Sequence, residues 1–130
     1  MPVKDVKRSR EFFTRIGLSF SDGPGNSDTS APLMVGSKHT IVMLFEQSQF
    51  KGFVRNEVTD TLASNEVLFS ISADSRDEVD ELARKVTAAG GIVFAEPGES
   101  QGWMYGCGFA DPDGHRWNAL FMDMNKLNSK

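Results

Sequence analysis

Residues 66–91, EVLFSISADSRDEVDELARKVTAAGG, place a strand pattern and a helix pattern on either side of one short polar turn. Apolar and polar side chains alternate over residues 66–72, which predicts a half-buried strand. Ser75 and Glu78 form the S-x-x-E capping box that opens a helix, and a Gly-Gly pair ends it. The apolar stripe of this helix contains Val79, Leu82, Ala83 and Val86. This stretch therefore predicts a strand followed directly by an amphipathic helix.

The same order of elements occurs in the first half of the chain. Asp5 can cap a helix, and Gly17 is a natural stop for it. The apolar face of that helix contains Val6, Ser9, Phe12, Phe13 and Ile16. Three strands are predicted after each helix: 18–21, 32–36 and 39–46 after the first, and 92–97, 103–110 and 115–123 after the second. The chain thus repeats a β-α-β-β-β unit, although only four residues precede Asp5.

The length of 130 residues predicts a single domain, and the repeated unit predicts the α+β class. Within residues 1–130 we expect a first module over about residues 1–50 and a second over about 66–124. A connector over about 51–65, with a helical turn or two, joins them, and residues 125–130 form a tail. The alternative that this pattern leaves open is a generic α+β sandwich.

Composition and charge exclude several classes of function. The net charge is −4 and the chain has no basic stripe, which argues against a nucleic-acid partner. No apolar run approaches the roughly 18 residues that a membrane span needs. Cys107 is the only cysteine, so no internal disulfide forms, and this fits a reducing cytoplasm. Ten Phe and two Trp are enough to fill a core and also to line a pocket.

Residues 2–20, 66–91 and 104–123 resemble the vicinal oxygen chelate superfamily of glyoxalase I, bleomycin-resistance proteins and extradiol dioxygenases. The D-x-x-x-S start of the first helix and the DPDG turn at residues 111–114 carry the resemblance, which is greatest to small bacterial glyoxalase-like (lactoylglutathione-lyase-like) proteins. It implies two modules whose mixed sheets curl around a cavity, a homodimer, and a small-molecule ligand. In the enzymes of the family it also implies a divalent metal such as Zn, Ni, Mn or Fe.

The resemblance places four metal ligands on the first and last strands of the modules. The first position lies ahead of Asp5 and falls off this chain. The second lies near Val42 or Met43, which are not hard ligands. The third falls on Glu66, where His is usual, and the fourth falls on Asn118, whose amide oxygen is a weak substitute for a carboxylate. Glu66 and Asn118 are therefore the only metal candidates, and Glu66 is the only catalytic candidate.

Strand parity, oriented by the same resemblance, separates a cavity face from a helix face. Trp117 and Phe121 should pack under a helix, as should Val67, Phe69 and Ile71. The nine residues expected to line the cavity or its rim are Met43, Glu66, Leu68, Ser70, Trp103, Tyr105, Asn118, Leu120 and Met122. Such a pocket is mostly apolar with few polar groups, which is typical of a small-molecule site.

Two functions from different classes fit these residues. One is a metal-independent binding protein of the bleomycin-resistance type. The other is a divalent-metal-dependent lyase, isomerase or dioxygenase that uses Glu66. His39 and His115 are expected to be exposed turn residues, and Cys107 a small buried hydrophobe.

Overall fold

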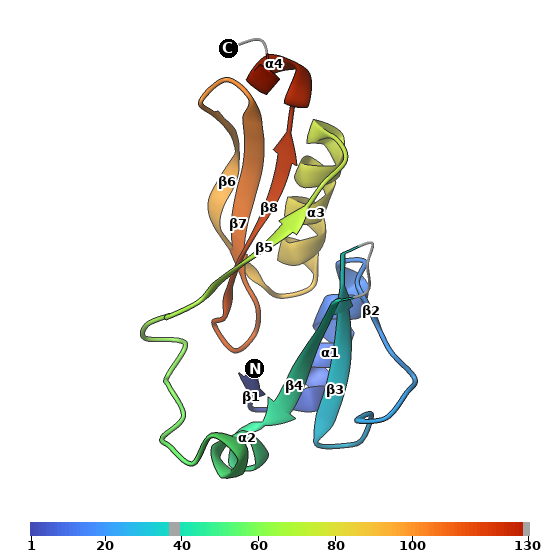
Figure 1. Cartoon of the computed structure of the whole chain (residues 1–130), viewed down its shortest axis with the longest axis vertical. Coiled ribbons are helices and arrows are strands. Elements are labelled where there is room, and N and C mark those ends of the chain that lie inside the picture. Colours follow the sequence, from blue (N-terminus) through green and yellow to red (C-terminus); the bar gives the residue numbers. More distant parts are fainter. Residues whose placement is uncertain (37–39, 129–130) are drawn as a thin grey trace.

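The computed structural model, which describes residues 1–36 and 40–128, contains two four-stranded mixed sheets with helices (Figure 1). The first module holds β1 (Pro2–Val3), α1 (Val6–Arg15), β2 (Ser19–Phe20), β3 (Ser30–Val35) and β4 (Thr40–Glu46). After α2 (Gln47–Val54), the second holds β5 (Leu68–Ser72), α3 (Arg76–Ala88), β6 (Ile92–Ser100), β7 (Met104–Ala110) and β8 (Arg116–Met122), followed by α4 (Met124–Asn128). No helix among the described residues is long and apolar enough to cross a membrane.

The two sheets have the same connectivity, which confirms the predicted repeat and the α+β class. Their strand orders are β1-β4-β3-β2 and β5-β8-β7-β6. In each sheet the first strand of the module pairs in parallel with the last, and the other pairs are antiparallel. The same short sequence pattern therefore builds the same sheet twice.

The predicted helix caps form. The Asp5 carboxylate accepts hydrogen bonds from the backbone N–H groups of Lys7 at 3.0 Å and Arg8 at 3.3 Å. At the start of α3, Ser75 Oγ accepts from the Glu78 N–H at 3.1 Å. These bonds satisfy N–H groups that a helix leaves without intrahelical partners, so each helix begins where the sequence predicts.

Strand boundaries differ from the prediction by one to three residues, and two of these differences bear on the candidate site. β5 begins at Leu68 rather than at Glu66, so Glu66 lies in the chain that leads into the sheet. β6 continues through Gly98 to Ser100, beyond residue 97, where the predicted strand ends. Register shifts between Val93 and Gly98 accommodate Pro97, which cannot donate to the ladder, and let the strand resume pairing with β7.

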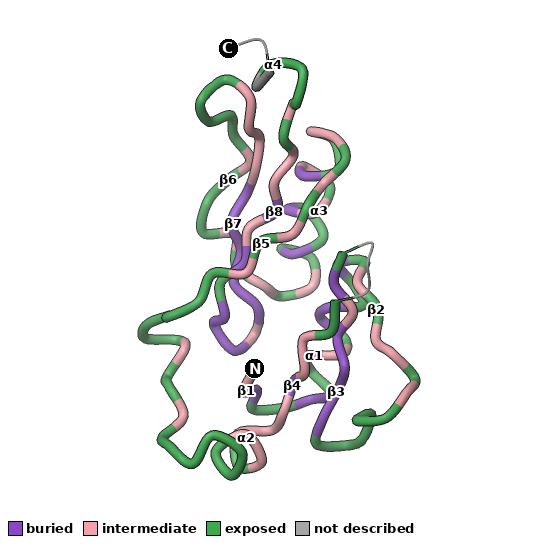
Figure 2. Tube along the Cα trace, in the orientation of Figure 1, coloured by how far each residue is buried: buried purple, intermediate pink, exposed green. Residues whose placement is uncertain are grey.

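The hydrophobic core joins the two modules. Phe12 and Phe13 on α1 pack against the second sheet, where the Phe13 and Trp117 rings lie 5.4 Å apart and the Phe12 and Phe109 rings 6.4 Å apart. Phe69 stacks on Trp117 at 4.7 Å. Figure 2 shows the buried segments running along β3, β7 and the β7–β8 turn. The modules thus share one core on the helix side of the sheets.

The DPDG turn between β7 and β8 reaches across to the N-terminal segment of the first module (Figure 1). Asp113 is buried and accepts hydrogen bonds from the Lys4 N–H at 2.9 Å and the Arg8 guanidinium at 3.1 Å. Ser9 Oγ donates to the same carboxylate at 3.4 Å. These hydrogen bonds therefore hold the turn of module two against the N-terminal segment and α1.

His115 is buried, so the expectation that it is an exposed turn residue is wrong. Its side chain is 6% exposed, and Nε2 donates a 2.6 Å hydrogen bond to the backbone carbonyl of Pro2. His115 is buried because the N-terminal segment, which is distant in the sequence, covers the turn. His39 lies outside the described residues.

Candidate functional site

The two faces of the second sheet differ in what covers them. Trp117 and Ala119 of β8 are buried beneath the helices, and Phe121 packs against the same core. Asn118 and Leu120 point to the opposite face, where Met122 is 45% exposed. This open face leaves room for a ligand over the second sheet.

A shallow cavity of about 240 Å³ lies on this open face. It is lined by Leu68, Phe94, Ala95, Gly98, Ser100, Met104, Gly106, Cys107, Gly108, Asn118 and Leu120. None of these described lining residues is charged. The structure thus brings together Leu68, Asn118 and Leu120 of the predicted set, while Ser70 is the strand partner of Asn118 on β5.

Two glycines of β7 form the floor of the cavity. A Cβ atom at Gly106 would lie 2.6 Å from Leu120 Cδ2, and one at Gly108 would lie 2.6 Å from the Phe94 ring. Without these side chains, the Phe94 ring reaches over the strand toward β8. The Arg116 guanidinium then stacks on the Phe94 ring, 4.2 Å from its centroid. Glycine inside a strand often marks such a close approach.

Asn118 is the central polar group of the cavity. Its Oδ1 atom is buried and has no hydrogen-bond partner within the described part of the chain. Gly108 on β7 has no side chain, and Ser70 on β5 does not reach Asn118 with a hydrogen bond in the described structure. Leaving a buried acceptor unsatisfied costs about 1–3 kcal/mol. A water molecule or a ligand in the cavity can supply the missing donor.

Other predicted cavity residues lie elsewhere. Tyr105 is on the helix face of β7, where its hydroxyl donates a 2.6 Å hydrogen bond to Asp80 on α3, and that bond raises the pKa of the phenol. Trp103 is in the β6–β7 turn, and its carbonyl accepts from the Asp123 N–H at 2.7 Å. Met43 is on the open face of the first sheet. The structure therefore does not bring these three together with Asn118.

Cys107 belongs to the core rather than to a reactive site. It is 4% exposed and packs with Val79, Ala83 and Ala119. Burial raises the pKa of its thiol, which disfavours the nucleophilic thiolate. This confirms the expectation of a small buried hydrophobe.

The register of the two sheets identifies which residues of the modules correspond. Pro2 lies three residues before Asp5, the N-cap of α1, and pairs with Phe45 of β4. Ser72 lies three residues before Ser75, the N-cap of α3, and pairs with Leu120 of β8. Phe45 therefore corresponds to Leu120, and Met43 two residues earlier corresponds to Asn118.

The donors at the metal positions that the resemblance implies do not suit a hard divalent ion. Met43 offers a thioether, which prefers soft metals, and Asn118 offers a neutral amide. Glu66 is exposed and precedes the first paired residue of β5. Within residues 1–36 and 40–128, no group of three or more His, Cys, Asp or Glu side chains is arranged to hold a metal ion.

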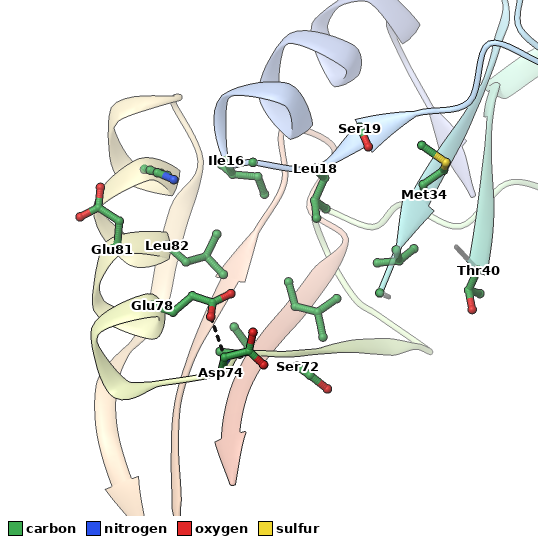
Figure 3. Close-up of a pocket in the computed structure, with 17 residues that line it drawn as sticks. Ile16, Leu18, Ser19, Met34, Thr40, Ser72, Asp74, Glu78, Glu81 and Leu82 are labelled. Atoms are coloured by element: carbon green, nitrogen blue, oxygen red, sulfur yellow. Dashed lines mark hydrogen bonds between the residues drawn. The ribbon is translucent and has the colours of Figure 1, made fainter. Parts of the chain in front are cut away.

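A larger cavity of about 760 Å³ lies between the modules on the helix side (Figure 3). Ile16 and Leu18 face Leu82 across it, and Asp74 and Glu78 lie at its edge. Both carboxylates are exposed, and Glu78 accepts a 2.8 Å hydrogen bond from the Asp74 N–H. None of the nine predicted residues lines this cavity, so we place the candidate site over the second sheet.

The sequence prediction missed Phe94, Met104 and the two glycines of the cavity floor. The sequence placed Phe94 in a strand but did not indicate which face of the sheet it lies on, because the register shifts in β6 interrupt the simple alternation of side chains. The Gly-x-Gly pattern at residues 106–108 was a usable signal, since glycine in a strand weakens it unless something approaches closely. Both features depend on the pairing of β6 with β7.

Known structures share this fold. A hypothetical protein from Staphylococcus aureus is 34% identical, with a TM-score of 0.82 over 93% of this chain and 88% of that one. A glyoxalase-related enzyme from Fulvimarina pelagi is 18% identical, with a TM-score of 0.79 over 93% and 83%. A lactoylglutathione lyase from Agrobacterium tumefaciens is 17% identical, with a TM-score of 0.67 over 95% and 90%.

The sequence itself also matches a family. No functionally curated protein matches the chain. The model of the Glyoxalase/Bleomycin resistance protein/Dioxygenase superfamily matches residues 1–119, which cover both modules through most of β8. The chain therefore belongs to the Glyoxalase/Bleomycin resistance protein/Dioxygenase superfamily.

Proposed function

We propose that this chain binds a small, largely apolar molecule over its second sheet and does so without a resident metal ion. The observation that supports this most directly is the pair of corresponding positions Met43 and Asn118, which carry no charge where the family's enzymes place metal ligands. The cavity beside Asn118 is lined by apolar side chains and glycine backbone, as small-molecule sites commonly are. We also infer a cytoplasmic location from the free thiol of Cys107.

We propose further that the protein works as a homodimer in which a second copy covers the open sheet faces. Large apolar side chains lie exposed on both faces: Ile41 is 44% exposed on the first sheet, and Leu68 is 54% and Met122 45% exposed on the second. Large apolar side chains left exposed on sheet faces are consistent with an association site. A second copy would also close the shallow cavity from above.

Replacing Ile41 with glutamate should shift the protein from dimer to monomer, because the new carboxylate would be desolvated in the interface. Light scattering after size-exclusion chromatography would measure the mass. Leu62→Glu is the matched control, since Leu62 is 63% exposed but lies in the connector. A wild-type monomer, or an Ile41→Glu variant that stays dimeric, would contradict this assembly.

Binding without a metal can be tested with isopropylbenzene, a neutral apolar probe, on protein held in a chelator. We expect the backbone amide resonances of Gly106 and Gly108 to shift on titration, since these residues form the floor of the cavity. Stoichiometric Ni²⁺, Zn²⁺ or Mn²⁺ in protein purified without chelator, together with isomerisation of a hemithioacetal, would favour the metal-dependent lyase instead. In that outcome, loss of the metal in Glu66→Ala would identify Glu66 as a ligand.

Asn118→Glu should raise divalent-metal affinity only modestly, by about tenfold or less, because Met43 still supplies no hard ligand. Calorimetric titration with Ni²⁺ and Zn²⁺ would measure the change. Ser70→Glu, on the neighbouring strand of the same face, is the control for added charge alone. Tight stoichiometric binding by Asn118→Glu would show that other side chains complete a metal site.

A further inference from the structure

The environment of Asn118 restricts the chemistry of the ligand beyond its being small and apolar. Asn118 is flanked on the open face by Ser70 of β5 and Gly108 of β7, its partners in the two strand ladders. Neither neighbour forms a hydrogen bond with its side chain in the described residues, and Oδ1 is buried without a partner. The carboxamide is thus a polar group held in an apolar setting with its acceptor unused.

A carboxamide offers an acceptor and two donors in one plane. Rotation about its terminal bond follows a broad torsion, so the edge that carries both Oδ1 and Nδ2 can turn toward the cavity. A second planar group with an N–H next to a C=O matches this arrangement with two hydrogen bonds. A ligand that supplies only an acceptor or only a donor would leave one group of the pair unsatisfied.

The charges around the cavity favour a neutral ligand. No described lining residue is charged, so neither a carboxylate nor an ammonium would find a counter-ion in the lining. The nearest cation on the same strand face is Arg116, which is engaged with the Phe94 ring at 4.2 Å. The cavity of about 240 Å³ suits a body of about one ring.

We propose that the ligand carries a neutral primary amide or lactam on a small apolar body, and that this group pairs with the Asn118 carboxamide. The inference rests on the proposed binding function and names the chemical class that the site selects. The apolar body lies in the trough over Gly106 and Gly108, between Phe94 and Leu120. Asn118 thereby acts as the specificity-determining residue.

The test compares four probes of similar size: benzamide, acetophenone, isopropylbenzene and benzoate. They differ in offering a donor and an acceptor, an acceptor alone, neither, or a charge. Dissociation constants come from shifts of the Gly106 and Gly108 amide resonances. We expect the wild type to bind benzamide about tenfold more tightly than isopropylbenzene, the factor expected for about one net hydrogen bond in a dry site.

Variants locate this preference. Asn118→Leu should remove the preference for benzamide while isopropylbenzene still binds, and Asn118→Asp should weaken benzamide because a charge replaces the donor. Asn26→Leu is the matched control and should keep the wild-type preference, since Asn26 is exposed in the loop before β3 and does not line the cavity. Circular dichroism confirms that each variant is folded.

The possible failures can be told apart. Equal binding of benzamide and isopropylbenzene by wild type and Asn118→Leu would overturn the amide preference and leave the apolar binding site standing. Tighter binding of benzoate would overturn it in favour of recognition through Arg116. If no probe shifts Gly106 or Gly108, both this inference and the proposed function fail.

Discussion

Replacing Asp113 with alanine should lower the free energy of unfolding by about 3 kcal/mol, the lower end of the range for breaking a buried ion pair. The Asp113 side chain is 4% exposed and pairs with Arg8 at 3.1 Å. Arg8 is 45% exposed, so water compensates part of its loss. The substitution also leaves the buried Ser9 Oγ and the partly buried Lys4 N–H without their acceptor, which adds to the cost.

This loss should be measured by urea unfolding of the wild type and variant at pH 7. Asp22→Ala is the matched control, because Asp22 is an exposed loop carboxylate, and it should change stability by less than about 0.5 kcal/mol. Because Asp113 bonds residues of the other module, the variant should also show faster hydrogen exchange at the Lys4 N–H. An effect of Asp113→Ala as small as that of Asp22→Ala would show that the turn does not hold the modules together.

The second large effect concerns pH. Burial raises the pKa of the Asp111 carboxyl from 3.8 to about 6, against the opposing effects of His115 and of the Trp117 indole N–H. The Trp117 indole donates to Asp111 at 3.1 Å, and the backbone N–H groups of Asp113 and His115 donate at 3.0 Å and 3.1 Å. These bonds favour the carboxylate but do not offset its loss of hydration.

The sign of the effect follows from proton binding. The folded protein binds the Asp111 proton more tightly than the unfolded chain does, so this stabilising contribution is fully present below pH 3.8. It is lost as pH rises through about 6. The difference between the two pKa values corresponds to about 3 kcal/mol.

Asp111→Asn isolates this contribution because the amide does not ionise. Between pH 4 and pH 7 the wild type should lose about 2 kcal/mol relative to Asp111→Asn, because at pH 4 the unfolded chain is already partly ionised at Asp111. Urea unfolding at several pH values measures the difference, and Asp22→Asn should track the wild type. Parallel stability curves for wild type and Asp111→Asn would mean that Asp111 keeps an ordinary pKa in the folded protein.

The elements that the sequence predicted best are those set by neighbours in the chain. The capping bonds of Asp5 and Ser75 join residues only two or three positions apart, so their residue types alone indicate where the helices begin. The faces of β8 followed from the two-residue period of a strand, and Trp117 and Asn118 do lie on opposite sides.

The prediction failed where a boundary depended on the partner strand. Residues 98–100 have the composition of a loop, yet they pair with β7 after the bulge in β6. Glu66 continues the alternating pattern of β5, yet pairing with β8 starts at Leu68. The composition of a segment indicates which conformations it can adopt, whereas hydrogen bonding to the neighbouring strand determines where the strand starts and ends.

By itself, the sequence determined the repeated β-α-β-β-β unit, its helix caps and the placement of Asn118 on the face opposite Trp117, because these depend on local spacing. Only the tertiary structure decided that Asp113 bonds Lys4, 109 residues away, and that His115 is buried under Pro2. It also decided that Tyr105 bonds Asp80 while Asn118 Oδ1 has no partner among the described residues. Those outcomes depend on which distant surfaces meet, and the local pattern of side chains does not encode that.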